Sequence, residues 1–109
     1  MNYNIIPTGL FKKQAKRLCK KYHSLPEELR KLELILSTNP RSGIDLGNNT
    51  YKIRISIQSK GKGKRGGARI VTFVVSIDEE VYFLTIYDKS EIEKISDEKI
   101  SEMIKMIRK

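Results

Sequence analysis

Cysteine and histidine are almost missing from this 109-residue sequence, which contains one of each, Cys19 and His23. A single cysteine excludes an internal disulfide and is typical of a protein from a reducing cytosol. A single histidine excludes a pair of histidines acting as acid and base, and no cysteine and histidine cluster has the spacing of a metal site. Neither a Ser-His-Asp set nor paired carboxylates in apolar surroundings are present. We therefore expect no metal and no cofactor.

Long apolar runs are missing as well. No stretch approaches the roughly 20 apolar residues that cross a bilayer. Residues 1–6 lack the charged start and the apolar segment of a signal peptide, and no lipidation signal is visible. We expect a soluble, cytoplasmic protein without a membrane partner, in which residues 1–109 form one domain around a single core.

Acidic residues are absent from the middle of the chain, between Asp45 and Asp78. The same stretch carries seven basic residues: Lys52, Arg54, Lys60, Lys62, Lys64, Arg65 and Arg69. Over the whole chain, 22 lysines and arginines face 13 acids, which gives a formal charge of +9. Such a block repels itself and favours a strongly anionic partner, above all the phosphate backbone of a nucleic acid.

The basic stretch divides into a strand, a loop and a second strand. Residues 51–57 alternate apolar and polar side chains, which predicts a half-buried strand with Lys52 and Arg54 on its polar face. Residues 59–67 alternate glycine with cations, which predicts a solvated loop able to lie close to a ligand. It is not a phosphate-binding P-loop, because no Ser or Thr follows Gly-Lys at a helix start. Residues 68–77 are β-branched and apolar, which predicts a central strand buried on both faces.

Two helices are predicted before this stretch. Thr8 is the expected N-cap of a helix of about four turns whose polar face is basic. Ser24 is the expected N-cap of a second helix, with Glu27 completing a capping box, and Asn39-Pro40 ends it. The short link between the two helices predicts an antiparallel helical hairpin.

The remaining segments complete a small mixed domain. Residues 3–6 predict an edge strand closed by Pro7, residues 41–50 a polar loop, and residues 81–87 the third strand of an antiparallel meander. Ser96 is the expected N-cap of a final amphipathic helix. The predicted order is β-α-α-β-β-β-α, an α+β domain in two layers, with the helices packed on one face of an antiparallel sheet.

The chemistry that these residues permit is metal-free RNA cleavage. Lysines and arginines gather on the sheet together with the tyrosines Tyr51, Tyr82 and Tyr87. Cations beside a phosphodiester stabilise charge that develops on phosphorus, and a lysine or tyrosine among other cations can move protons. The neighbouring 2′-hydroxyl would be the nucleophile. Composition alone leaves open a patch that only binds RNA.

Several segments of the chain together carry a resemblance to a known family: Leu46-Gly47, Tyr51-Lys52-Ile53-Arg54, the run from Ser59 to Ile70, and Leu84-Thr85-Ile86-Tyr87-Asp88-Lys89. They resemble the RelE/ParE toxin superfamily, and within it most of all the HigB-like branch. It covers nearly the whole chain, and residues 59–70 are its most specific part. The resemblance implies the toxin of a type II toxin–antitoxin pair, which enters the ribosomal A site and cuts mRNA there.

The resemblance also implies which residues would act. The two basic positions of the family's first meander strand fall on Lys52 and Arg54, and its arginine at the start of the next strand falls on Arg69. Arg54 and Arg69 would stabilise the phosphorane. The loop cations would hold the nucleic acid: Lys60, Lys62, Lys64 and Arg65.

Two positions depart from the pattern of RelE. Ser90 stands where RelE has a second arginine after the last strand, and Ile95 or Ser96 stands where RelE has a tyrosine in its C-terminal segment. Tyr87 and Lys89, at the end of the last strand, are the substitutes by position. The proton carrier would then be Lys52, Tyr87 or Lys89.

Two other functions stay open on the sequence. A ParE-like toxin has this fold, lacks the basic cleavage site and inhibits DNA gyrase by binding, and a housekeeping RNA-binding protein would have no catalytic activity. Basic residues on the first meander strand and at Arg69 favour the nuclease. The expected partners are the ribosome, mRNA and a cognate antitoxin encoded by the adjacent gene.

Overall fold

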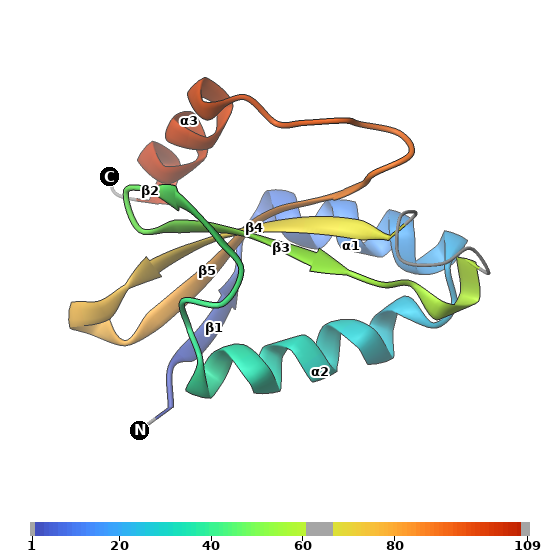
Figure 1. Ribbon diagram of the computed structural model, residues 1–109, viewed down its shortest axis with the longest axis horizontal. Coiled ribbons are helices and arrows are strands. Elements are labelled where there is room, and N and C mark those ends of the chain that lie inside the picture. Colours follow the sequence, from blue (N-terminus) through green and yellow to red (C-terminus); the bar gives the residue numbers. More distant parts are fainter. Residues whose placement is uncertain (1, 61–66, 108–109) are drawn as a thin grey trace.

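The computed structural model describes residues 2–60 and 67–107, which form a five-stranded sheet and three α-helices (Figure 1). The strands are β1 (Asn4–Pro7), β2 (Ile44–Gly47), β3 (Thr50–Ile55), β4 (Ala68–Val75) and β5 (Glu80–Asp88). The helices are α1 (Gly9–Lys21), α2 (Leu25–Thr38) and α3 (Asp97–Ile107), and two 3-10 turns, η1 (Gln58–Lys60) and η3 (Ser76–Asp78), follow β3 and β4. The predicted α+β class is confirmed.

The strand order β1-β5-β4-β3-β2 places β4 in the centre of the sheet. Strands β3, β4 and β5 are antiparallel neighbours, as the predicted meander requires. β1 lies at the edge, as expected, but it pairs with β5 in parallel, so the sheet is mixed and the expected purely antiparallel sheet is wrong at this edge. The connection from β1 to the meander runs through helices α1 and α2, and a connection of this length allows β1 to pair in either direction.

The two faces of the sheet are covered by different helices. Leu18 of α1 and Leu36 of α2 share a core with Ile70. Ile100 of α3 packs in a second core with the next strand residue, Val71. Because successive strand residues point to opposite faces, α3 lies on the face away from α1 and α2. The expectation that all helices pack on one face is therefore wrong for α3, and β4 is buried from both sides, as its apolar sequence predicted.

Two of the three predicted N-cap residues cap their helices through their side chains. The Thr8 hydroxyl accepts a hydrogen bond from the Phe11 amide at 3.2 Å, and the Ser96 hydroxyl accepts one from the Lys99 amide at 3.2 Å. Ser24 precedes α2 without capping it through its side chain. The predicted capping box is wrong, because Glu27 pairs with Arg30 instead.

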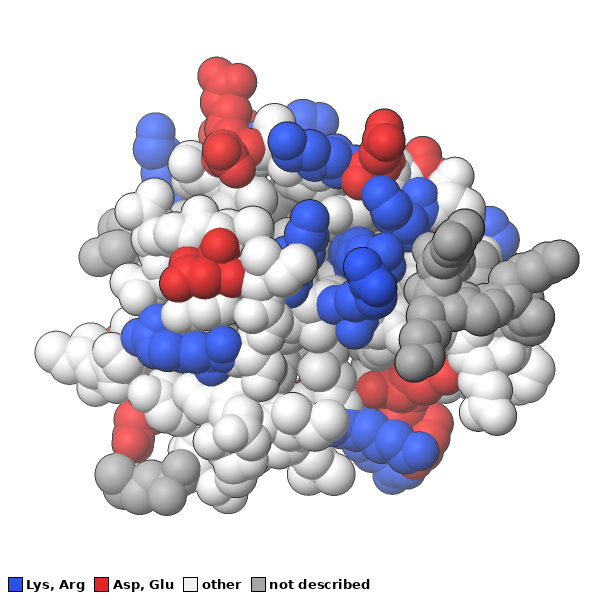
Figure 2. All heavy atoms as spheres, in the orientation of Figure 1, with Lys and Arg blue, Asp and Glu red and all other residues white. Residues whose placement is uncertain are grey.

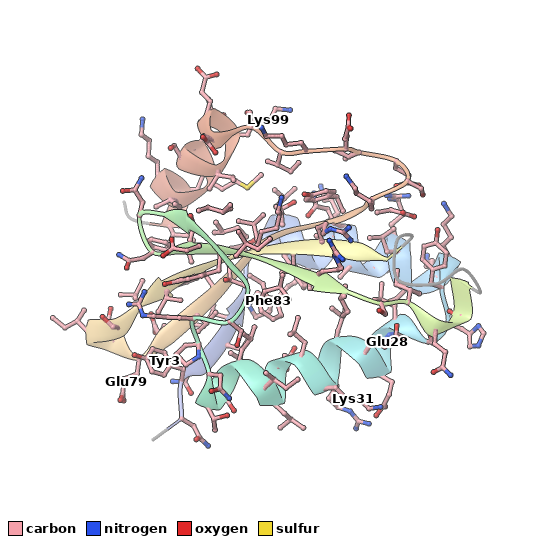
Figure 3. All side chains as sticks on the ribbon, viewed as in Figure 1. Tyr3, Glu28, Lys31, Glu79, Phe83 and Lys99 are labelled. Atoms are coloured by element: carbon pink, nitrogen blue, oxygen red, sulfur yellow. The ribbon has the colours of Figure 1, made fainter. Side chains whose placement is uncertain are left out.

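Ser24 instead ties the α1–α2 link to the start of the basic loop. Its hydroxyl lies 2.9 Å from the Ser59 hydroxyl, and it accepts a hydrogen bond from the Ser59 amide at 2.9 Å. Glu28 accepts a hydrogen bond from the Gln58 amide at 2.8 Å, and Figure 3 shows its side chain on the sheet side of α2, whereas Lys31 points away. These hydrogen bonds from Ser24 and Glu28 therefore hold the start of the basic loop against α2 and the link before it.

The loop predicted over residues 41–50 contains a strand. β2 pairs with β3 through a tight turn in which Asn48 and Asn49 have φ of 53° and 64°. Asparagine tolerates this left-handed region better than other residues with a side chain, and two such residues in succession favour a hairpin. The Asn48-Asn49 pair is the sequence signal for this hairpin, and the prediction of a polar loop did not include the hairpin.

Candidate cleavage site and nucleic-acid interface

A small cleft of about 150 Å³ opens on the sheet face away from α1 and α2. Its lining contains all five predicted catalytic residues and two others: Ile44, Lys52, Arg54, Arg69, Tyr87, Lys89 and Glu93. Figure 2 shows lysine and arginine side chains gathered over the β3 and β4 region of this face. The five residues, which span positions 52 to 89, therefore share one concave surface.

Strand register explains why three of them meet. Arg54 of β3 is the direct partner of Arg69 of β4, and Arg69 is the direct partner of Tyr87 of β5. Directly opposed residues of an antiparallel pair point to the same face with their Cβ atoms about 5 Å apart. The sheet thus places two guanidinium groups and a phenol in one row, and Lys52 lies two residues along β3 on the same face.

Arg69 is the buried cation of the row, with 7% of its surface exposed. Its Nη1 donates to the Ala68 carbonyl oxygen at 3.2 Å. Burial lowers the pKa of Arg69 from its ordinary value, and the neighbouring charge of Arg54 lowers it further. An arginine stays protonated at neutral pH even so, because its ordinary pKa is above 12. Arg69 is therefore a fixed, poorly hydrated positive charge suited to an anion.

Tyr87 is held as a neutral phenol. Its side chain is buried, with 3% of the residue exposed, and burial raises its pKa from the ordinary value near 10. The charge of Arg69 opposes that rise with a smaller effect. At neutral pH Tyr87 carries its proton, so it can donate one and cannot accept one.

Lys89 is held at the mouth of the cleft by two contacts. Its backbone amide donates to the Gly67 carbonyl oxygen at 3.2 Å, and its Nζ donates to the Glu93 carbonyl oxygen at 3.3 Å. Gly67 itself lies so close to β3 that a Cβ there would meet the Ile55 carbonyl oxygen at 2.0 Å. Only glycine fits where the chain returns from the basic loop to the sheet.

The basic loop is described only at its two ends. Lys60 closes η1, while Lys62, Lys64 and Arg65 lie outside the described residues. Their predicted contact with nucleic acid stays a prediction. Of the described ends, η1 follows β3, and the Gly67 carbonyl oxygen accepts a hydrogen bond from the amide of Lys89, which lines the cleft.

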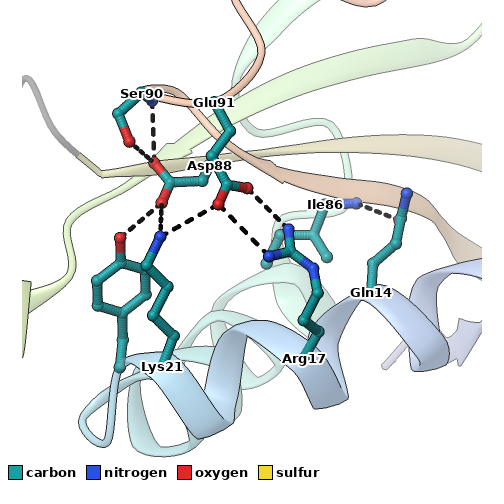
Figure 4. Close-up of polar contacts among 8 residues, drawn as sticks. Gln14, Arg17, Lys21, Ile86, Asp88, Ser90 and Glu91 are labelled. Atoms are coloured by element: carbon teal, nitrogen blue, oxygen red, sulfur yellow. Dashed lines mark hydrogen bonds and ion pairs between the residues drawn. The ribbon is translucent and has the colours of Figure 1, made fainter.

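Three residues of this region were not predicted from the sequence. Ile44 and Glu93 line the cleft. Asp88, between Tyr87 and Lys89, is fully buried and accepts hydrogen bonds from the Tyr22 hydroxyl and from Ser90 (Figure 4). An acidic residue at the end of an apolar strand in so basic a chain was a sequence signal that Asp88 is buried with a partner. The partner, Tyr22, lies 66 residues away and could not be predicted from sequence spacing.

Neither a metal-ligand cluster nor a membrane-spanning helix is found in residues 2–60 and 67–107. No three His, Cys, Asp or Glu side chains gather there as a metal ion would require. None of the helices in the same ranges is long and apolar enough to cross a bilayer.

Comparison with known proteins gives a family for this chain. Residues 10–109 match the family model described as the RelE toxin of the RelE / RelB toxin–antitoxin system. The fold is similar to that of a free E. coli RelE toxin with two arginines changed to alanine, at 20% identity and a TM-score of 0.65 over 98% of this chain and 99% of that one. A crystal structure of the isolated E. coli RelE toxin gives 20% identity and a TM-score of 0.58 over 96% and 98%. Because the family model spans nearly the whole sequence, the chain belongs to the RelE toxin family.

Proposed function

We propose that this toxin is a ribosome-dependent endoribonuclease that cleaves mRNA in the ribosomal A site. The observation that carries the proposal is the meeting of Lys52, Arg54, Arg69, Tyr87 and Lys89 in one cleft. A cleft of this volume is too small to enclose a nucleotide and suits a single phosphate with its neighbouring ribose edge. The substrate would therefore lie across the sheet face rather than inside a pocket.

The reaction is attack of a 2′-hydroxyl oxygen on the adjacent phosphorus. The P–O5′ bond breaks, which leaves a 2′,3′-cyclic phosphate on one product and a 5′-hydroxyl on the other. Arg54 and Arg69 face this phosphate together and stabilise the negative charge of the phosphorane. Arg69 contributes most, because its buried guanidinium is fixed before the substrate arrives.

Two protons move in this reaction. Tyr87 is the donor to the departing 5′-oxygen, because burial keeps its phenol protonated. The acceptor of the 2′-hydroxyl proton is Lys52 or Lys89, because both line the cleft with Tyr87. A lysine as base explains how the site dispenses with histidine.

Ribosome dependence follows from how little of the substrate the cleft encloses. An open, cationic surface gives affinity for phosphates without orienting one phosphodiester for in-line attack. We infer that the ribosome supplies this orientation by presenting the mRNA codon, while the basic loop and the exposed face of α1 bind ribosomal RNA. The proposed function also places the protein in the cytoplasm, where ribosomes translate.

Primer extension on mRNA with and without ribosomes tests the proposal. Cleavage is expected only in the presence of ribosomes, and end-group analysis should find a 2′,3′-cyclic phosphate and a 5′-hydroxyl. A 3′-hydroxyl with a 5′-phosphate would contradict the mechanism. Inhibition of DNA gyrase without any mRNA cleavage would identify a ParE-like toxin instead.

Membership of a toxin–antitoxin family implies an antitoxin partner. We propose that the gene adjacent to this one encodes it and that it silences the toxin by covering the cationic face or by blocking entry to the ribosome. The two gene products should co-purify as a stable complex. Normal growth of cells that express this chain alone would count heavily against a toxin. The assignment to the HigB-like branch stays a prediction.

A further inference from the structure

Asp88 is a buried carboxylate at the end of β5, with none of its surface exposed. Both of its oxygens accept hydrogen bonds. Oδ2 accepts one from the Tyr22 hydroxyl at 2.6 Å, and Oδ1 accepts two from Ser90, one from the amide at 2.9 Å and one from the hydroxyl at 2.7 Å. We call Tyr22, Asp88 and Ser90 the Asp88 clamp, and Figure 4 shows Asp88 and Ser90 beside the end of α1.

The clamp fixes the end of β5 against the end of α1. Tyr22 is the C-cap residue of α1, and its own amide donates to the Leu18 carbonyl oxygen, so its hydroxyl is aimed from a rigid helix end. A buried carboxylate is costly to desolvate unless its lone pairs are satisfied, which makes this geometry strongly preferred over any in which Asp88 loses a donor. Nearer the start of α1, the side-chain Oε1 of Gln14 accepts a hydrogen bond from the Ile86 amide at 3.0 Å.

A second set of contacts surrounds the clamp on the solvent side. Glu91 accepts hydrogen bonds from Arg17 at 2.7 Å and from Lys21 at 3.1 Å, and the Lys21 ammonium also lies 3.9 Å from Asp88. These groups are partly exposed, and exposed ion pairs contribute little. The buried hydrogen bonds of the clamp are therefore the part that sets position.

The clamp is joined through the backbone to the proposed proton carriers. Tyr87 precedes Asp88 and Lys89 follows it, and strand alternation sends Asp88 toward α1 while its neighbours face the cleft. The Lys89 amide also bonds to Gly67, so any shift of the strand end would move the Lys89 side chain and the Tyr87 ring together.

We propose that Tyr22 and Asp88 are positioning residues for RNA cleavage, because they hold Tyr87 and Lys89 at the distances that proton transfer requires. This inference rests on the proposed nuclease function. It assigns a role to the α1 side of the sheet, which does not touch the substrate.

The variant Tyr22→Phe tests the inference because it removes only the hydroxyl that donates to Asp88. Misplacement of reacting groups by about 1 Å can cost about a hundredfold in rate, and a lost tether should cost at least about tenfold in kcat. KM for ribosome-bound mRNA should stay within about twofold, because the cationic surface is intact. Ser90→Ala removes a second donor and should lower kcat less, since the Ser90 amide still bonds to Asp88.

Tyr82→Phe is the matched control. Like Tyr22→Phe, it removes one tyrosine hydroxyl. Tyr82 lies on β5, and its hydroxyl donates to Glu80 at 2.9 Å, near the end of the strand away from Asp88. We expect parental kcat and KM from it. Hydrogen exchange of the Lys89 amide should be faster in Tyr22→Phe than in the parent, whereas amides at the Glu80 end of β5 should exchange at parental rates.

Each outcome decides the question. A kcat of Tyr22→Phe equal to that of the parent overturns the inference. The inference is also overturned if the lower kcat of Tyr22→Phe is explained entirely by a smaller fraction of folded protein. In that case kcat would return to the parental value at temperatures where thermal unfolding shows the variant to be fully folded, and Tyr22 would have only a structural role. A parent protein that cleaves no mRNA on ribosomes overturns the proposed function and this inference with it, which separates that failure from failure of the inference alone.

Discussion

Arg54 and Arg69 stand directly opposite each other across the β3–β4 pair, on the same face of the sheet. Like charges in this arrangement destabilise a sheet, and here one of the two is buried. The pKa of Arg69 is lowered by its burial and by Arg54, which is the signature of an unfavourable environment for a cation. A phosphate bound between the two guanidinium groups would relieve the repulsion, as the proposed function requires.

The first prediction follows from this repulsion. Arg54→Gln removes one of the two charges from an exposed position, so the free energy of unfolding should rise by about 0.2 to 1 kcal/mol. The same variant should lose cleavage activity, because one donor to the phosphorane is gone. Urea unfolding measures the first effect. The control Arg30→Gln removes an exposed arginine whose partner is Glu27 and should give no rise in stability.

Arg69→Ala should reduce the cleavage rate on ribosome-bound mRNA by about a hundred- to a thousandfold, the usual cost of losing one stabilising donor. Ribosome binding should be largely retained, because the loop and α1 cations remain. Toxicity in growing cells should disappear. Ribosome sedimentation and single-turnover cleavage separate the two effects, and an Arg69→Ala protein that still cleaves at the parental rate would remove Arg69 from the mechanism.

The sequence was sufficient to predict the meander and the polar face of β3 that carries Lys52 and Arg54 of the candidate site. Strict alternation over residues 51–57 put Lys52 and Arg54 on one face, and all four apolar residues between 51 and 57 are buried on the other. The partnership of Arg54 with Arg69 and Tyr87 needed the register of three strands. A glycine-rich loop fixes register poorly, so the resemblance to a family, rather than the pattern, brought these residues together.

The features that were missed depend on contacts between distant residues. β2 is four residues long and turns at two asparagines, so its alternation is too short to detect. The Ser24 hydroxyl had a better partner in Ser59 than in its own helix, and the Asp88 carboxylate found Tyr22 across the core. Local propensity predicts where a helix begins, but it does not tell which polar groups the tertiary structure will pair.

Gly67→Ala should destabilise the fold, because its Cβ would overlap the Ile55 carbonyl oxygen. Backbone cannot move away as a flexible side chain would, so we expect a loss of about 1 to 3 kcal/mol or more in the free energy of unfolding. Gly9→Ala is the matched control, since a Cβ there meets nothing within 4 Å. It should be neutral or stabilise by up to about 1 kcal/mol. Equal unfolding midpoints for the two variants would contradict the close approach at Gly67.

Removing the four loop charges should weaken ribosome binding and flatten its salt dependence. The variant changes every loop cation to glutamine: Lys60, Lys62, Lys64 and Arg65. Each phosphate contact that is lost should lower the slope of log affinity against log salt by about 0.7 to 0.9. A control with the same change of charge should bind nearly as the parent does. It replaces four exposed lysines outside the loop and α1 by glutamine: Lys31, Lys94, Lys99 and Lys105. If the loop variant binds like the parent at every salt concentration, the loop is not the contact.

The last prediction concerns the proton of Tyr87. Burial favours the neutral phenol, so Tyr87 should ionise only above its ordinary pKa of 10. Tyr82 is shifted in the same direction, chiefly by its hydrogen bond to Glu80, so the two must be separated. Ultraviolet titration of the parent and of Tyr87→Phe does so, because their difference is the titration of Tyr87 alone.

A raised pKa in the folded state also has a consequence for stability. The stabilising effect of neutral Tyr87 is fully present below its unfolded pKa near 10 and is lost as pH rises through the folded value. The parent should therefore lose stability with rising alkaline pH more steeply than Tyr87→Phe. A difference titration that showed Tyr87 ionised below pH 10 would contradict the effect of burial on its pKa. If Tyr87 were ionised at neutral pH, the phenolate would be suited to accept a proton, and its assignment as the donor to the 5′-oxygen would have to be exchanged with that of a lysine.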